Sequence, residues 1–145
     1  MGEFDEILGH HLEQAYRYRS ELGHEDEGAR RLGRRAGGLL SAAGRRAFMR
    51  GDAPAAAALL GRAAELLPQD SDERLELLPS LSSALMQSGA EFAAVDAVIE
   101  DAVTHARARG NRAVEARAIV ERLWIEENSR PGLSDDENEA IRRGG

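Results

Sequence analysis

The sequence predicts an all-α protein in which about six helices form antiparallel hairpins. Ala, Leu, Arg and Glu, which favour helices, fill much of the 145-residue chain. Residues with β-branched side chains are too sparse and scattered to form strand-length runs. Glycine and proline recur where stretches of helical periodicity end, and the turns between these stretches are short. Short turns place consecutive helices side by side in opposite directions.

The first two predicted helices occupy residues 3–22 and 25–50. In both, apolar residues recur at steps of three and four, as expected of helices with one face in a core. Gly23 ends the first helix. Gly51 ends the second, because glycine takes the left-handed conformation without steric strain.

Caps and helix breakers bound the next four helices. Asp52 caps the third, and proline follows its last turn. Pro79 lies inside the fourth helix and removes a backbone donor, so we expect either a kink there or a later helix start. The expected ranges of these helices are 52–68, 70–88, 91–109 and 111–127.

The last residues, 128–145, are expected to form an acidic C-terminal tail. Arg130-Pro131-Gly132 breaks the preceding helix. Ser134-x-x-Glu137 is a capping box that predicts a short final helix. Residues 1–127 are therefore expected to form one helical domain.

An internal repeat organises this domain. Residues 37–70 carry large and small side chains in the order typical of a tetratricopeptide repeat, with Gly51 at the turn. Small residues allow paired helices to approach closely, and leucines fill the seam between them. The positions of this pattern are Leu40, Ala43, Gly44, Ala47, Ala56, Leu60, Ala63 and Pro68.

A second copy spans residues 75–109, and an incomplete third copy spans residues 111–127. Gly89 occupies the place of Gly51, 38 positions later (89 − 51), against an ideal period of about 34. We therefore predict a right-handed tetratricopeptide-like helical-repeat solenoid with an extra N-terminal helix at 3–22.

Five segments carry a family resemblance: HLEQAYRYRSEL at 11–22, AAGRRA at 42–47, RGDAPAA at 50–56, LLP at 66–68 and RLELLP at 74–79. They resemble the tetratricopeptide-like region of large bacterial signal-transduction ATPases of the STAND type. Such proteins often also carry an adenylate/guanylate cyclase or a DNA-binding regulator domain. The resemblance implies a bacterial regulatory segment. The nucleotide-binding loop and the cyclase residues of the family have no counterpart here, so neither activity is carried over.

Charge and composition exclude several function classes. The chain has 26 Asp and Glu against 19 basic residues, all of them Arg, for a net charge of −7. This balance argues against general nucleic-acid or anionic-membrane binding. The absence of Lys excludes Schiff-base enzymes and a phosphate-loop lysine, and the absence of Cys excludes disulfides, zinc-thiolate sites and cysteine nucleophiles. Without a leader or an apolar span, we expect a cytoplasmic protein.

The first helix of each repeat is expected to line a groove. Residues at the inward positions are Ser41, Arg45, Phe48, Met49, Ser83, Met86, Gln87, Arg117, Glu121 and Trp124. Phe, Met and Trp with Arg at the edge suit an amphipathic helix or an extended apolar segment. Alternatively, the N-terminal helix or a second subunit covers these residues. We expect a non-enzymatic interaction scaffold without a cofactor, which binds a protein segment or neighbouring domains and also self-associates through its apolar ends.

Two other functions stay open. In the first, a cluster of basic residues would contact an anion or nucleic acid, or dock against an acidic neighbouring domain. Alternatively, this cluster is a solvated helix face balanced by acids at 25–27. The members of this cluster are Arg30, Arg31, Arg34, Arg35, Arg45, Arg46 and Arg50. Less favoured is a small metal-binding bundle that uses Glu6, His10 and Glu13, because a second inward carboxylate–histidine motif is missing. No spacing indicates a catalytic triad, so we expect neither catalytic nor metal-binding residues.

Overall fold

The computed structural model describes residues 2–129, which form six helices and contain no strand. The predicted all-α class and the number of helices are thereby confirmed for this part of the chain. The predicted tail helix at Ser134 lies outside the described residues. The helices are α1 Gly2–Glu21, α2 Glu27–Met49, α3 Ala53–Leu66, α4 Asp72–Gln87, α5 Phe92–Arg109 and α6 Arg112–Ser129.

Local sequence explains where the helices begin and end. Four side chains accept a hydrogen bond of 2.9–3.2 Å from the backbone N–H three residues later and so cap α2, α3, α4 and α6. These caps are Asp26, Asp52, Ser71 and Asn111. Glycines with positive φ follow α1, α2, α4 and α5, namely Gly23, Gly51, Gly89 and Gly110.

Helix α4 corrects one alternative from the sequence. It begins at Asp72 and continues through Pro79 to Gln87, so the later start is wrong. The Ser71 cap fixes the start of the helix upstream of the proline, and the buried side chain of Leu75 anchors its first turns in the core. A well-packed helix face therefore outweighs the loss of one backbone donor.

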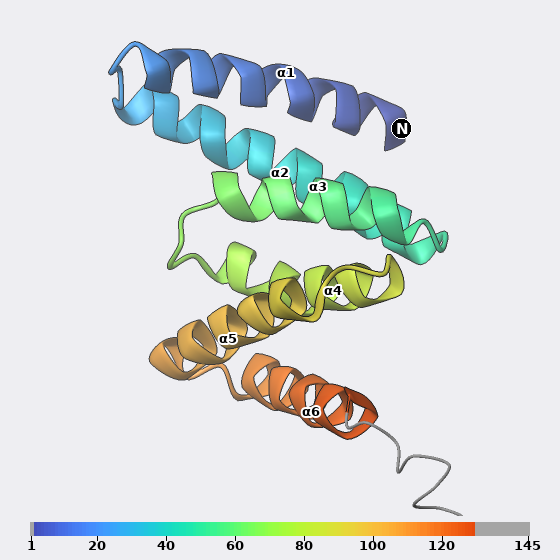
Figure 1. Ribbon diagram of the computed structural model, residues 1–145. Coiled ribbons are helices and arrows are strands. Elements are labelled where there is room, and N and C mark those ends of the chain that lie inside the picture. The colour runs from blue at the N-terminus through green and yellow to red at the C-terminus, as the bar shows by residue number, and fades with distance from the viewer. Residues whose placement is uncertain (1, 130–145) are drawn as a thin grey trace, which may run out of the picture.

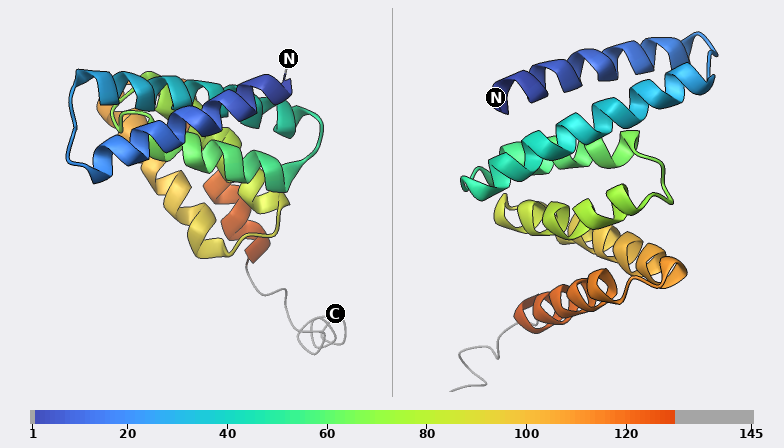
Figure 2. Two further views of the ribbon diagram at one scale, coloured as in Figure 1. Left: turned by 90° about the horizontal axis from the view of Figure 1, so that it is seen from above. Right: turned by 180° about the vertical axis from the view of Figure 1, so that it is seen from behind.

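The helices stack in chain order, and each runs back along the one before it (Figure 1). In addition to these sequential contacts, α2 packs on α4 and α4 packs on α6. We call these three helices the α2–α4–α6 row. The two further views place α1 at one end of the stack and α6 at the other (Figure 2). None of the described helices combines the length and apolar character needed to cross a bilayer.

Glycine and alanine determine how closely α2 approaches α3. A Cβ atom on Gly44 would lie 2.7 Å from Cγ of Leu60, and one on Gly37 would lie 2.8 Å from Cγ of Leu67. Both distances are too short for an added carbon, so α2 touches α3 through Gly44 and the residue that follows α3 through Gly37. The small residues of the predicted repeat are buried, namely Ala43, Gly44, Ala47, Ala56 and Ala63.

One apolar core runs through the stack from α2 to α6. Its largest fully buried apolar side chains are Leu40, Leu60, Leu75, Leu77, Leu78 and Ile99. Leucines from α2, α3 and α4 meet in its centre, and Ile99 of α5 extends it towards α6. The α2–α4–α6 row is therefore held in place by the same core that α3 and α5 share.

Candidate protein-binding groove

The α2 part of the predicted groove is only partly exposed. Arg45 and Met49 are exposed, whereas Phe48 is half-buried and packs against the core. Ser41 is 3% exposed, so it lies inside the stack and not on the surface where the sequence pattern placed it. It shares a helix face with Gly37 and Gly44, both of which pack against α3 or the loop that follows.

The α4–α6 part is organised around a carboxylate. Ser83 donates a 2.9 Å hydrogen bond from Oγ to Oε1 of Glu121, and the buried hydroxyl of Ser82 contacts Oε2 of the same carboxylate. Glu121 therefore spans from α6 to two adjacent residues of α4. These contacts fix α6 along α4 and so determine where the neighbouring side chains of α6 point.

A pocket of about 310 Å³ opens beside these hydrogen bonds, where α4 ends, α5 begins and the last turns of α6 pass. It is lined by Met86, Ala90, Phe92, Val95, Trp124, Ile125 and Asn128. Phe92 is 52% exposed and Trp124 is 60% exposed. The side-chain amide of Asn128 donates a 2.7 Å hydrogen bond to the Trp124 carbonyl oxygen. A largely apolar pocket with two exposed aromatic rings can accept apolar side chains of a partner.

The structure thus brings together four of the predicted groove residues: Ser83 and Glu121 through a hydrogen bond, and Met86 and Trp124 through the pocket. The side chains of Gln87 and Arg117 are exposed and make no hydrogen bond or ion pair with the described residues. None of the four residues predicted on α2 lines the pocket.

Sequence analysis missed Phe92, which lies at the start of α5 and so belongs to the second helix of its hairpin. Repeat positions select groove residues only from the first helix, and for that reason Phe92 was left out. The sequence does contain a local indication that Phe92 is exposed. It is one of three phenylalanines in the chain and follows the turn glycine Gly89 closely. A large apolar residue in the first turn after a tight turn has few neighbours that can cover it.

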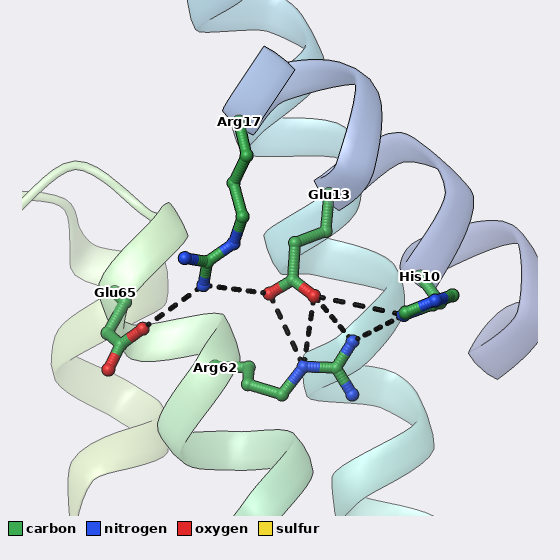
Figure 3. A network of polar contacts seen from close by, with 5 residues as sticks. All are labelled: His10, Glu13, Arg17, Arg62 and Glu65. Carbon is green, nitrogen blue, oxygen red and sulfur yellow. Dashed lines mark hydrogen bonds and ion pairs between the residues drawn. The ribbon is translucent and has the colours of Figure 1, made fainter. Parts of the chain in front are cut away.

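A buried ion pair ties α1 to α3 (Figure 3). The carboxylate of Glu13 is 2% exposed and lies 2.5 Å from Nη2 and 3.1 Å from Nε of Arg62. His10 Nδ1 lies 3.1 Å from the same Nη2, and Arg17 bridges Glu13 and Glu65 at 3.5 Å each. Burial raises the pKa of Glu13, but the hydrogen bonds and charge of Arg62, together with Arg17, outweigh burial and leave this pKa below its ordinary value.

This geometry is relevant to the metal-binding bundle that the sequence left open for Glu6, His10 and Glu13. Glu13 and His10 both face the Arg62 guanidinium, a cation that already neutralises the carboxylate. Over residues 2–129, no three His, Cys, Asp or Glu side chains lie close enough together to hold a metal ion.

A buried arginine, Arg74, joins α3, α4 and α5. Arg74 donates from Nε to the Ala64 carbonyl oxygen at 3.0 Å and binds Asp101 through both terminal nitrogens at 3.0 and 2.5 Å. His105 Nδ1 lies 2.7 Å from the Asp101 carboxylate. Burial raises the pKa of Asp101, but Arg74 and then His105 outweigh it, so this pKa also lies below its ordinary value. The bidentate pair fixes α5, which carries Phe92, against α4.

The arginine cluster lies on α2 and is mostly unpaired. Arg46 pairs with Asp5 at 2.7 Å, and Arg50 pairs with Asp52 at 3.7 Å. The other five are exposed, and their side chains form no ion pair or hydrogen bond with the described residues, namely Arg30, Arg31, Arg34, Arg35 and Arg45.

Comparison with known proteins found no matching family model, curated protein or solved structure. The resemblance to STAND-type ATPases therefore stays a prediction. The function has to be inferred from the residues and their arrangement.

Proposed function

We propose that this protein is a non-enzymatic interaction scaffold, a short tetratricopeptide-like solenoid whose inner side is the α2–α4–α6 row. Three observations support the solenoid: sequential helix packing, additional contacts between alternate helices, and burial of the small residues of the repeat pattern. In the solenoid, α2–α3 and α4–α5 are the complete hairpins and α6 begins the next one. We further propose that the segment serves a bacterial signalling protein, as its resemblance to STAND-type ATPases implies.

The observation that carries the binding function is the pair of exposed aromatic rings at the C-terminal pocket. Phe92 and Trp124 are each more than half exposed, although their neighbours Val95 and Ile125 are buried. Removing apolar surface from water stabilises a complex by roughly 25 cal/mol per Å². Aromatic side chains at the rim of a pocket are the usual anchors of protein interfaces.

The partner that fits this pocket is an amphipathic helix. Its apolar side chains, spaced at three and four residues, would enter between Met86 and Trp124. Its polar face would remain towards solvent and the exposed side chains of Gln87 and Arg117. Methionine suits such a site because its flexible thioether adapts to differently shaped side chains.

The test uses a displayed library of amphipathic helical peptides, selected on the immobilised protein and synthesised with a fluorescent label. We expect the selected peptides to bind the wild type and to lose at least ten-fold in affinity with Trp124→Ala or Met86→Ala. Leu123→Ala is the matched control, because Leu123 is exposed on α6 but does not line the pocket.

Intrinsic fluorescence gives a second readout. Trp124 is the only tryptophan of the chain, so a bound helix should shift its emission to shorter wavelength by covering the ring. Peptides that bind with equal affinity to wild type and Trp124→Ala would contradict the proposed site.

A second candidate function follows from the five unpaired arginines of α2. Five exposed cations on one helix favour an anionic partner such as duplex nucleic acid. Anisotropy with labelled duplex DNA at low salt would test this, comparing wild type with Arg31→Ala/Arg35→Ala. Salt-sensitive binding that the double substitution abolishes would support this second function, and absence of binding at low salt, as the net charge of −7 favours, would exclude it.

A further inference from the structure

Helix α1 carries exposed apolar residues on a face that adjoins its packed face. Its inner face packs Leu12 and Tyr16 against the core behind α2. Its outer face exposes Phe4 (76%), Ile7 (58%) and Tyr18 (64%), followed by Leu22 (56%) just beyond the last residue of the helix. A helix whose apolar residues extend beyond its packed face is typical of one with a further neighbour. In the stack, α1 packs on α2 and contacts α3 from its inner side, and its outer side faces away from the other described helices (Figure 1).

The outer face forms one continuous stripe. Phe4, Ile7, His11, Ala15, Tyr18 and Leu22 recur at three- and four-residue steps, and all are exposed. A 20-residue helix is about 30 Å long, so the stripe runs along the whole edge of the stack. The exposed parts of its large side chains amount to roughly 500 Å². Two such stripes in contact would bury about 1,000 Å², the lower limit for a specific interface.

We propose that the outer stripe of α1 pairs with the same stripe of a second copy of this chain, with the two helices antiparallel. The first third of α1 exposes Glu3 and Glu6, which form no ion pair with the described residues. The last third carries Arg17 and Arg19, which are about half exposed and also pair within the chain with acids of the α1–α3 contact and of the α1–α2 turn. Antiparallel pairing places the acidic end of each helix beside the basic end of its partner, and parallel pairing would place like charges together.

Full overlap of the two stripes sets the register. Phe4 of one copy then lies beside Leu22 of the other, and His11 lies beside Ala15. Such a two-fold contact is closed, so it gives a dimer and not an open chain of subunits. The pairing uses the end of the stack opposite the C-terminal pocket and leaves that pocket open.

Sedimentation equilibrium over a range of concentrations tests the pairing. We expect the wild type to dimerise with micromolar affinity and Ile7→Glu to weaken the dimer at least 100-fold. Tyr18→Glu serves as a second variant, and both should keep the wild-type circular dichroism because their side chains already face solvent. The matched control is Val120→Glu, since Val120 is 64% exposed on α6 at the other end of the stack.

Cysteine cross-linking tests the antiparallel register, because the chain contains no cysteine. We expect disulfide-linked dimers when Phe4→Cys and Leu22→Cys proteins are mixed under mild oxidation, and few when either protein is alone. Efficient cross-linking of Phe4→Cys with itself would overturn the antiparallel arrangement.

Two further results would overturn the inference. One is a strict monomer at all concentrations, and the other is a dimer that Val120→Glu abolishes and Ile7→Glu does not, which would move the contact to α6. Trp124→Ala should leave the dimer intact, so failure of the dimer and failure of the groove are distinguishable.

Discussion

The contact between α2 and α3 and the contact between α4 and α6 hold the stack together by different means. At the first, Gly44 lets Leu60 approach so closely that no added carbon fits. At the second, Glu121 reaches across to the hydroxyls of Ser82 and Ser83, and Trp124 on the same helix stays exposed. At the α2–α3 contact, close packing buries the apolar side chains. At the α4–α6 contact, the hydrogen bonds of Glu121 join the helices and aromatic surface stays exposed for a partner.

Polar contacts also join α6 to α5, in the form of ion pairs. Arg122 pairs with Glu100 of α5 and approaches Asp96 to 4.0 Å, and Arg107 of α5 pairs with Glu115 at 2.8 Å. Most of these side chains are solvent-accessible, so each pair contributes at most about 1 kcal/mol. We infer that the α2–α3 hairpin supplies most of the stability and that α6 supplies the binding surface.

The largest effect is expected at the junction of the two regions, where Arg74 joins α3 to α4 and α5. Arg74→Met should lower the free energy of unfolding by about 3 kcal/mol, because, among the described residues, it removes both guanidinium hydrogen bonds from the Asp101 carboxylate, which keeps only His105, and the one donor of the Ala64 carbonyl. Chemical denaturation measures the change. Arg109→Met is the control, since Arg109 and its partner Asp72 are exposed, and an equal loss in both variants would contradict this role.

A glycine pair tests the close packing of the α2–α3 hairpin. Gly44→Ala should destabilise the protein by about 2 kcal/mol, because the new Cβ atom overlaps Leu60. Gly61→Ala in α3 meets no atom within 4 Å, and we expect it to stabilise by about 0.5–1 kcal/mol through helix propensity. Thermal melts of both variants measure these shifts. Equal shifts would show that the hairpin does not depend on contact through Gly44.

Acid should weaken the attachment of α1 to α3 through Glu13. Its pKa in the folded state lies below that in the unfolded chain, so its contribution is fully present above an unfolded pKa of about 4.3 and is lost as the pH falls through the folded value. Glu13→Gln should cost about 1 kcal/mol at pH 7 and flatten the loss of stability as the pH falls below the unfolded pKa of Glu13.

Urea denaturation at several pH values measures this dependence. Asp101 has the same sign of shift in wild type and variant, so the difference between the two proteins isolates Glu13. Glu65→Gln, at an exposed position of the same network, should keep the wild-type profile. An unchanged pH dependence in Glu13→Gln would remove the carboxylate from this role.

The smallest effect on stability is expected in the pocket. Trp124→Ala should change the free energy of unfolding by about 0.5 kcal/mol, because most of the ring is already in water. Leu60→Ala, in the core, should cost about 3 kcal/mol. Denaturation of the two variants gives the comparison, and a large loss in Trp124→Ala would mean that the residue serves the fold and not a partner.

Helix boundaries could be predicted from the sequence because caps and turn glycines act locally. Asp52 and Asn111 bond to backbone three residues away, and Gly51 and Gly89 need only their own backbone to turn the chain. A periodic pattern also identified the small residues at the α2–α3 contact. The same pattern failed for Ser41, which it placed on the exposed side of α2. Ser41 is buried on the α2 face that also carries Gly37 and Gly44, and the pattern alone does not show which residues of a helix remain exposed to solvent.

Contacts between distant residues could not be predicted in this way. Glu13 and Arg62 are 49 positions apart, and Arg74 and Asp101 are 27 apart, with no repeated spacing that connects them. The sequence alone therefore leaves Glu13 open as a metal ligand, whereas in the structure it binds Arg62. Phe92 was missed for a related reason, since its exposure depends on how α6 lies across α5, which is a tertiary property.

The distance between α1 and α6 tests the open stack most directly. Spin labels on Gln14→Cys and Ala116→Cys, in the monomeric Ile7→Glu background, report this distance by pulsed electron resonance without competing cysteines. Because neighbouring helices are about 10 Å apart and several layers intervene, we predict a distribution centred beyond about 30 Å. A distribution centred below about 20 Å would place α1 beside α6 in a closed bundle, and the α2–α4–α6 row would then not form an open binding face.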